Sequence, residues 1–222
     1  MRRGRRALAL LLIVAGALLL ADGAATLLWK EPLSSLYAQR QQATLEHRLT
    51  DLQHASAATF ERRAPARGTD ARRRLALAAR AFERQTHTGQ PLARLRIPAL
   101  GVSAVVVEGT RAGELRDGPG HYPATSLPGE GRTVAIAGHR TTFGAWFRHI
   151  DRLRPPDAIE VDLPYGHFTY RVQRTRIVKP TALWITRNAG YDRLVLSACH
   201  PVFSASKRIV VFARLAGAQL AR

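Results

Sequence analysis

The sequence contains a single cysteine, Cys199, and only three lysines among its 222 residues. One thiol cannot form an intrachain disulfide, so cross-links of that kind do not stabilise the fold. Clustered Cys and His ligands and a carboxylate-rich loop are also missing, so we predict neither a metal ion nor an organic cofactor. Internal repeats are absent, and one ordinary domain with accessory segments is the default expectation for a chain of this length.

Acidic residues are scarce too, with 16 Asp and Glu against 34 Lys and Arg and a formal net charge of +18. Residues 1–90 hold 15 basic and 7 acidic residues, and the remainder holds 19 and 9. The positive charge is therefore spread along the chain, and nucleic acid is not a predicted partner. A basic surface suits an anionic bilayer or wall polymer, but it is equally compatible with no dedicated partner.

The N-terminus has the features of an export signal. Four arginines precede the apolar run Ala7–Ala21, and a nearly apolar stretch continues through Asp22–Trp29. A run of this length can span a bilayer, and the arginine cluster favours a cytoplasmic N-terminus with everything after Lys30 outside. We predict an uncleaved single-pass anchor over residues 1–29. A signal peptide cleaved near Gly23–Ala25 is the alternative.

Residues 30–90 form a second predicted segment, which is polar and rich in Arg and Ala. The windows Leu36–Phe60 and Asp70–Phe82 contain good helix formers with sparse apolar positions, and the breaker Ala64–Gly68 separates them. We interpret this segment as a helical or partly disordered stalk that holds a catalytic domain off the bilayer. A helical subdomain packed on that domain is the alternative.

Residues 91–222 form the predicted catalytic domain, where short β-branched runs alternate with Gly and Pro. One helical segment is predicted over Phe143–Ile150. The regular spacing of the other runs favours a single all-β domain, either a barrel or a sandwich. The predicted strands are Leu92–Ile97, Ala104–Val107, Thr133–Ala137, Ile159–Leu163, Phe168–Val178, Leu194–Ala198 and Ile209–Leu215.

Cys199 follows directly after one of these hydrophobic runs. Pro201 lies two residues later and cannot continue a strand ladder, so the thiol is expected at a strand exit where it can face a groove. That position suits a nucleophile, whereas the alternative role for a lone cysteine is that of a small buried hydrophobe.

Two other residues could complete an acyl-transfer site. His139 lies at another predicted strand exit, and an imidazole can take or give a proton near neutral pH. His200 is adjacent to Cys199, but consecutive residues of an extended chain point to opposite faces, so His139 is the better partner. If the strands on either side of residues 200–207 pair antiparallel, Arg208 returns beside Cys199 and could stabilise an oxyanion.

These features resemble the sortase family, in which a His, a Cys at the end of a strand and an Arg opening the last strand occur in this order. The resemblance covers roughly Leu92–Leu215. Within it, the runs Gly118–Pro123, Ala137–Thr142 and Cys199–Ala205 are most similar to class E sortases of high-GC Gram-positive bacteria.

The resemblance implies an eight-stranded sortase-type β-barrel with short helices, preceded by the transmembrane helix and the stalk. It also implies a cysteine transpeptidase whose catalytic residues are His139, Cys199 and Arg208. Such an enzyme cleaves the sorting signal of a surface protein between Thr and Gly. It transfers the resulting acyl group from a Cys thioester to an amine of a cell-wall precursor or a pilin lysine.

One departure from the family pattern concerns the residues before the cysteine. Sortases usually read Thr-Leu-x-Thr-Cys, whereas this chain reads Val195-Leu196-Ser197-Ala198-Cys199. The resemblance assigns Ser197, Ala198, His200 and Tyr122 to sorting-peptide binding, and it leaves the choice between Leu-Pro-x-Thr-Gly and Leu-Ala-x-Thr-Gly signals open. For Tyr122, a packing role in a turn is the alternative.

Two other functions compete with this interpretation. Another extracytoplasmic Cys/His enzyme, such as an L,D-transpeptidase, would be expected to carry a Ser-x-Gly-Cys-Arg-like run, which is absent. A catalytically silent sortase-like module that binds peptides is the second alternative, and the altered residue before Cys199 is the feature that favours it.

Overall fold

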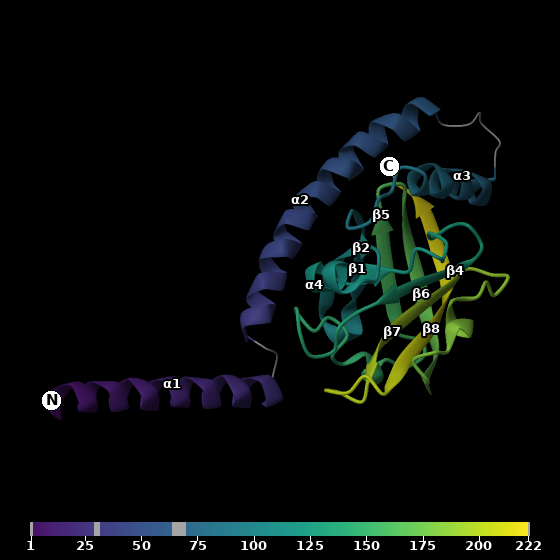
Figure 1. Cartoon of the computed structure of the whole chain (residues 1–222). Coiled ribbons are helices and arrows are strands. Elements are labelled where there is room, and N and C mark those ends of the chain that lie inside the picture. The colour runs from purple at the N-terminus through teal and green to yellow at the C-terminus, as the bar shows by residue number, and fades with distance from the viewer. Residues whose placement is uncertain (1, 29–31, 64–69, 222) are drawn as a thin grey trace.

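The computed structural model describes residues 2–28, 32–63 and 70–221, with side chains described for 6–23, 34–55 and 70–221. Eight strands close into one barrel in the order β1-β2-β3-β4-β7-β8-β6-β5 (Figure 1). The predicted all-β, eight-stranded barrel is confirmed. The strands are β1 (Pro91–Ile97), β2 (Val102–Glu108), β3 (Gly120–His121), β4 (Thr133–Ala137), β5 (Ala158–Leu163), β6 (Gly166–Val178), β7 (Arg193–His200) and β8 (Lys207–Leu220).

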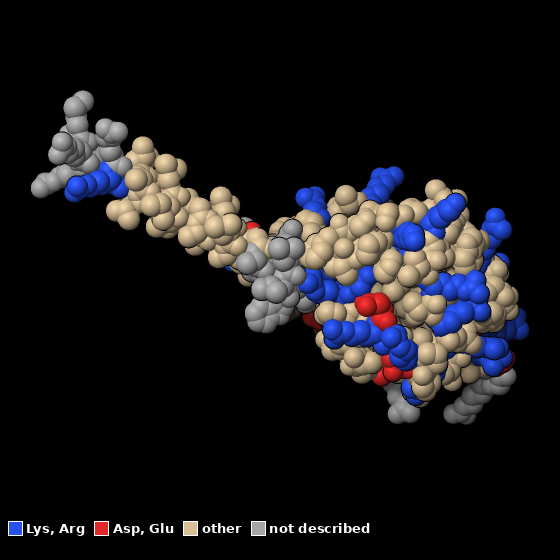
Figure 2. Space-filling view, turned by 90° about the horizontal axis from the view of Figure 1, so that it is seen from below, with Lys and Arg blue, Asp and Glu red and all other residues tan. Residues whose placement is uncertain are grey.

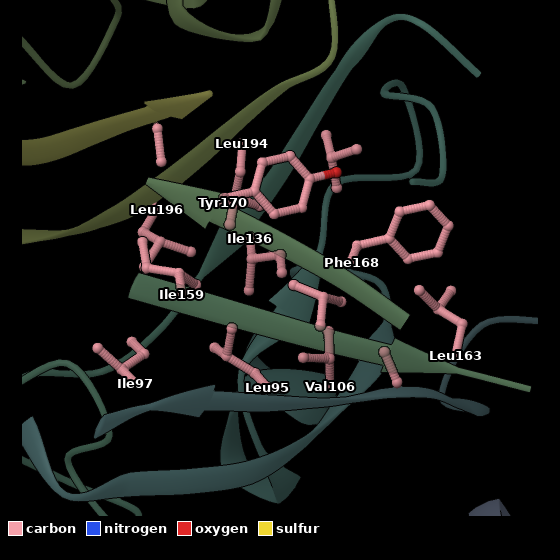
Figure 3. Close-up of a cluster of buried hydrophobic side chains, with 14 of the residues drawn as sticks. Leu95, Ile97, Val106, Ile136, Ile159, Leu163, Phe168, Tyr170, Leu194 and Leu196 are labelled. Carbon is pink, nitrogen blue, oxygen red and sulfur yellow. The ribbon is translucent and has the colours of Figure 1, made fainter. Parts of the chain in front are cut away.

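The barrel interior is filled by alternate side chains of its strands, as the period of two in a β-strand requires. On β7 these are Leu194, Leu196 and Ala198, and on β8 they include Ile209 and Val211. Figure 3 shows side chains of this cluster converging in the same space, among them Leu95, Ile136 and Leu196 from different strands. Because every second residue of β7 is committed to this core, Ser197 and Cys199 belong to the opposite, outer face.

Four α-helices and three short 3-10 helices accompany the described strands. The predicted helical character of the segments around 36–60 and 70–82 is confirmed, whereas the breaker Ala64–Gly68 and Trp29, the last residue of the predicted anchor, lie outside the described residues. The helices are α1 (Arg2–Leu28), α2 (Pro32–Arg63), α3 (Ala71–Glu83), α4 (Ala112–Asp117), η1 (Pro98–Leu100), η2 (Ile150–Arg152) and η3 (Leu183–Thr186).

The helix α3 closes one end of the barrel (Figure 1). The Asp70 side chain caps its start by accepting from the Arg72 backbone N–H at 3.1 Å. Its buried residues recur with helical spacing and join the barrel core; they are Leu75, Ala78, Ala79 and Phe82. The helix is therefore amphipathic, and its apolar stripe is an extension of the core.

The helix α2 lies along the outside of β1 and β2. Leu45 and Leu49 are buried against Val105 and Val107 of β2, and the amide of Gln42 bonds to the same strand. These contacts agree with the alternative in which residues 30–90 include helices packed on the barrel. The division of the chain at residues 29 and 90 stays a prediction.

The predicted helix over Phe143–Ile150 is wrong. This segment forms consecutive turns, and a 3-10 turn begins only at Ile150. Phe143, Gly144 and Ala145 all have positive φ, with values of 46°, 80° and 45°. A right-handed helix requires negative φ at every residue, so the apolar spacing of this segment reflects burial of turn residues instead.

The helix α1 contains an 18-residue window, Arg6–Gly23, with a mean hydropathy of 2.0 and no buried residues. It is long and apolar enough to cross a membrane, and a signal sequence would meet the same criterion.

The surface of the barrel carries scattered positive charge. Figure 2, which views the molecule from below, shows Lys and Arg side chains spread over the visible face of the barrel, with few acidic groups between them. The spread of positive charge expected from the sequence is thus visible on this surface.

Candidate functional site

His139 and Cys199 leave neighbouring parallel strands at the same level. The β4–β7 register pairs Ala137 with Ser197, and the Gly138 backbone N–H donates to the Ser197 carbonyl at 3.0 Å. His139 and Cys199 each lie two residues beyond that pair, so the strand geometry brings them side by side on the outer face. The strand exits that lead to the predicted base and the predicted nucleophile therefore lie at the same level, and the catalytic roles of the two residues stay a prediction.

Gly138 is required at this exit because of a close approach. A Cβ atom added there would lie 2.6 Å from a ring carbon of Phe147, which is fully buried in the core. The Phe147 backbone N–H in turn donates to the His139 carbonyl at 3.0 Å. The glycine thus lets the loop fold back tightly and fixes the backbone of His139.

The imidazole of His139 is partly buried beside Phe143, with 5.6 Å between the ring centroids. Burial lowers the pKa of His139 from its ordinary value of 6.5, because the imidazolium form loses hydration. The neutral imidazole is therefore the main form at neutral pH. In that form it can accept the proton of a nearby thiol.

Cys199 is a free, half-buried cysteine near the end of β7. The antiparallel register of β7 and β8 pairs Cys199 directly with Arg208, so both side chains extend from the same face. The pairing that the sequence analysis expected is present. The parallel neighbour β4 thus leads to His139 on one side of the thiol, and the antiparallel neighbour β8 provides Arg208 on the other.

The guanidinium of Arg208 is oriented by the loop that joins these strands. Its Nη1 donates to the carbonyls of Ala205 and Lys207 at 2.9 and 3.0 Å. The loop is itself closed by a Ser204 N–H bond to the Pro201 carbonyl at 3.0 Å. The Arg208 guanidinium is therefore bonded to backbone carbonyls of the loop that follows Cys199.

Tyr122 and Ser197 meet on the outer face close to Cys199. The Tyr122 hydroxyl lies 3.0 Å from Ser197 Oγ, and the Tyr122 ring packs on an apolar cluster that includes Val195 and Val210. Ser197 shares the face of Cys199 because the two are separated by one residue. The Ser197 side chain is buried at 2% exposed, and the assignment of Tyr122 and Ser197 to peptide binding stays a prediction.

The assignment of Ala198 to peptide binding is not supported by its position. Its side chain is 4% exposed and belongs to the interior core with Leu196 and Ile209. The cause is strand alternation, which turns the residue before Cys199 toward the barrel interior. His200, the other predicted peptide-binding residue on this strand, contacts an arginine: its Nδ1 accepts a hydrogen bond from Arg140 Nη1 at 3.3 Å.

Arg140 is a site residue that the sequence analysis did not select. It is 4% exposed, and its Nε and Nη2 donate to the Arg148 carbonyl at 3.1 and 2.9 Å. Its Nη2 also meets Asp151 Oδ1 at 2.6 Å. Burial lowers the pKa of Arg140, while the charges of Asp151 and Cys199 oppose that effect. The feature of the sequence that could have identified Arg140 is its position directly after His139.

The arrangement combines four chemical elements around one thiol. These are a neutral imidazole at the same strand level, an arginine on the paired strand, a buried second arginine nearby and an accessible outer face. Acyl transfer requires a nucleophile, a proton carrier and stabilisation of an oxyanion, and these residue types can supply such groups.

Comparison with known proteins identifies related chains. A family model described as "Sortase domain" matches residues 95–216. Sortase D of Bacillus subtilis is 35% identical over 131 residues, which cover 57% of this chain and 65% of that protein. Sortase SrtE1 of Streptomyces coelicolor is 28% identical over 143 residues, which cover 57% of this chain and 41% of that protein. The matches therefore span less than two thirds of these relatives.

Solved structures give the same result for the fold. Sortase E from Streptomyces avermitilis is 32% identical, with a TM-score of 0.55, and the match covers 60% of this chain and 93% of that one. The resemblance drawn from the sequence motifs is confirmed. The matched family region begins in β1 and ends in β8, so it contains His139, Cys199 and Arg208.

Proposed function

This chain belongs to the sortase family, and from that premise we propose that it is a membrane-anchored cysteine transpeptidase acting on the outer side of the membrane. The observation that carries the proposal is the register around Cys199, which has Arg208 as its antiparallel partner and His139 at the same level on the parallel strand. The proposed substrates are surface proteins with a Leu-Pro-x-Thr-Gly-like or Leu-Ala-x-Thr-Gly-like signal.

In the first half-reaction, neutral His139 takes the proton of Cys199, and the thiolate attacks the carbonyl carbon of the Thr–Gly bond. Arg208 stabilises the tetrahedral oxyanion, an effect of about 3 kcal/mol for a well-placed donor. Collapse of the intermediate breaks the C–N bond. The imidazolium of His139 gives its proton to the departing glycine amine, and a thioester with Cys199 remains.

In the second half-reaction, an amine of a peptidoglycan precursor or a pilin lysine attacks the thioester. His139 takes a proton from the amine, Arg208 again faces the oxyanion, and the Cys199 sulfur leaves. A new amide forms, and the thiol is restored by the proton that His139 carries. All groups needed for these steps are side chains of the chain itself.

An N-terminal anchor would concentrate both partners at the same surface. Membrane-retained substrate proteins and lipid-linked amine acceptors would meet the enzyme near the bilayer, so a high local concentration replaces high affinity. The scattered basic side chains of Figure 2 suit an anionic lipid surface. A mature N-terminus after Ala25 would contradict the uncleaved anchor.

The proposal is tested with the full chain in detergent micelles, a panel of both kinds of sorting peptide, and hydroxylamine as the amine. Mass spectrometry should detect cleavage between Thr and Gly and, without amine, a peptide thioester on Cys199. Cys199→Ala should abolish both. Turnover that survives this change would overturn the mechanism, and a folded wild type that forms no thioester with any peptide would favour a silent binding module.

A further inference from the structure

The loop that carries His139 is supported from outside the barrel by the first turns of α2. The Phe143 backbone N–H donates to Ser34 Oγ at 3.1 Å, across a separation of 109 residues. The ring of Tyr37 meets the ring of Phe143 edge-on, with a centroid distance of 6.2 Å and an interplanar angle of 76°. Phe143 is therefore held by α2 through both its backbone and its side chain.

Phe143 also forms the contact between α2 and the catalytic imidazole. Its ring lies 5.6 Å from the ring of His139. Tyr37, Phe143 and His139 thus form a continuous chain of ring contacts. The side chain of Phe143 alone therefore separates Tyr37 of α2 from His139 in this series of contacts, and a shift of α2 would move His139 through it.

The backbone of Phe143 needs such support. Its φ of 46° lies in the left-handed region, which is unfavourable for a bulky aromatic residue. Conformations of this kind persist where the surroundings fix them, and they concentrate at functional sites. Among the contacts of Phe143, the bond from its N–H to Ser34 and the packing of Tyr37 come from the same helix.

The first turns of α2 are themselves attached to the barrel. The Tyr37 hydroxyl donates to Asp117 Oδ1 at 3.2 Å, at the end of α4. Further along the helix, Gln42 Nε2 donates to the carbonyls of Asp117 and Val105 at 2.8 and 3.0 Å. Three residues separate α2 from α1, so covalent geometry keeps the start of α2 within about 15 Å of the end of the anchor helix.

We propose that Ser34 and Tyr37 make α2 a positioning element of the catalytic site, because they hold Phe143 against the imidazole of His139. This role rests on the proposed function for its catalytic meaning. It acts through Phe143, and neither Ser34 nor Tyr37 touches the reacting atoms. The first turns of α2, which follow the predicted anchor, thereby support the loop that carries His139.

The first test measures the titration of His139 by NMR in the full chain in detergent micelles, with ¹³C-labelled histidine and assignment by His139→Gln. In the wild type, burial keeps the pKa of His139 below 6.5. In Tyr37→Ala, the Phe143 ring loses its support and the imidazole gains water. The pKa of His139 should then rise toward 6.5.

Two variants serve as matched controls for this titration. Tyr37→Phe retains the ring and loses only the hydroxyl, so the His139 titration should match the wild type. Leu36→Ala shortens the neighbouring side chain, which is 49% exposed, and it should also leave the titration unchanged. Ser34→Ala removes only the acceptor of the Phe143 N–H, and it should shift the titration in the same direction as Tyr37→Ala.

The second test is turnover of a sorting peptide. Tyr37→Ala should lower kcat about tenfold with little change in KM, because a misplaced base slows the chemical step without removing peptide contacts. An unchanged His139 titration in folded Tyr37→Ala and Ser34→Ala chains would overturn the proposal. Faster turnover would also overturn it, because α2 would then be a cover over the site.

The titration does not depend on peptide turnover. If the wild type cleaves no peptide while the His139 titration shifts as expected, the proposed function fails and the positioning role of α2 is upheld. If peptides are cleaved and the titration is unaffected by Tyr37→Ala, the proposed function is upheld and the positioning role fails. Melting curves of each variant confirm that the chain remains folded.

Discussion

At the scale of single residues, the site around Cys199 depends on which face of a strand each side chain occupies. Cys199 and Ser197 extend to the outer face, whereas Ala198 between them lies in the core. The residue before the nucleophile is therefore a packing residue in this chain.

The lowered pKa of His139 predicts the pH dependence of thioester formation. Activity should fall as the pH drops through this pKa, because the imidazolium cannot take the thiol proton. A single-turnover pH profile of kcat/KM with a sorting peptide should therefore show an acid limb with an inflection below 6.5. An inflection above 6.5 would contradict the assignment of neutral His139 as the base.

The same pKa shift affects stability in a defined direction. Between the lowered value and 6.5, the unfolded chain binds a proton at residue 139 that the folded chain does not bind. The contribution of His139 to the free energy of unfolding therefore decreases as the pH falls through this window.

Arg140 is predicted to increase the reactivity of Cys199 through its positive charge. Arg140→Gln should slow alkylation of Cys199 by iodoacetamide at pH 7 by about threefold to tenfold, because it removes a positive charge that interacts with the attacking sulfur. Arg140→Lys should retain most of the rate, since it keeps the charge. Arg152→Gln, which removes an exposed charge from η2, is the control. A wild-type alkylation rate in a folded Arg140→Gln chain would contradict the prediction.

At the scale of secondary-structure elements, α2 completes the edge of β2. Gln42 Oε1 accepts from the Val105 N–H at 2.6 Å, and Gln42 Nε2 donates to the Val105 carbonyl at 3.0 Å. One side-chain amide thus satisfies both backbone groups that a neighbouring strand would have bonded. Gln42 takes the place of a neighbouring strand here because β3 pairs with β2 only at Val107 and Glu108.

Gln42→Ala is therefore predicted to destabilise the chain through unpaired backbone groups. The loss should be about 1–3 kcal/mol, because the Val105 N–H and the carbonyls of Val105 and Asp117 lose a partner beneath a packed helix. Denaturant unfolding measures the change, with Gln41→Ala as the control one position away. Equal stability of the two variants would show that water replaces the Gln42 amide at no cost.

The helical elements also show which structures a local sequence pattern predicts correctly and which it does not. The windows Leu36–Phe60 and Asp70–Phe82 predict helices correctly, because helix propensity summed over a long window is informative. The window Phe143–Ile150 has similar apolar spacing and forms turns, because three successive residues adopt positive φ. Contacts of Phe143 with Ser34 and Tyr37 of α2 support that conformation, and they come from a part of the chain more than 100 residues away.

At the scale of the whole molecule, the helices between α1 and the first strand pack on the barrel. The helix α3 contributes Leu75 and Phe82 to the core, and α2 covers the outer face of β2. The residues predicted to be a stalk therefore make two different kinds of contact with the barrel. Their arrangement places the first turns of α2 at the His139 loop.

Removal of α2 is predicted to expose an apolar surface on β2. A chain that begins at Pro32 should melt close to the full chain, whereas one that begins at Asp70 loses Leu45 and Leu49 from Val105 and Val107. The shorter chain should lose about 3–5 kcal/mol and melt roughly 10 °C or more lower. Thermal melting in detergent compares the three chains. Equal melting temperatures would restore the stalk interpretation.

The sequence by itself determined the local and covalent features of this protein: the single thiol, the apolar N-terminal run, the alternation that specifies strands, and the motif order that identifies the family. These follow from composition and short-range pattern. Tertiary structure alone decided which side chains meet. The parallel pairing of β4 with β7 brings the strand exits before His139 and Cys199 to the same level, Arg140 is buried, and α2 packs on Phe143. These arrangements join residues about 60 to 110 positions apart in the sequence, or they depend on burial. A local stretch of sequence encodes neither the register between distant strands nor the loss of water around a buried group.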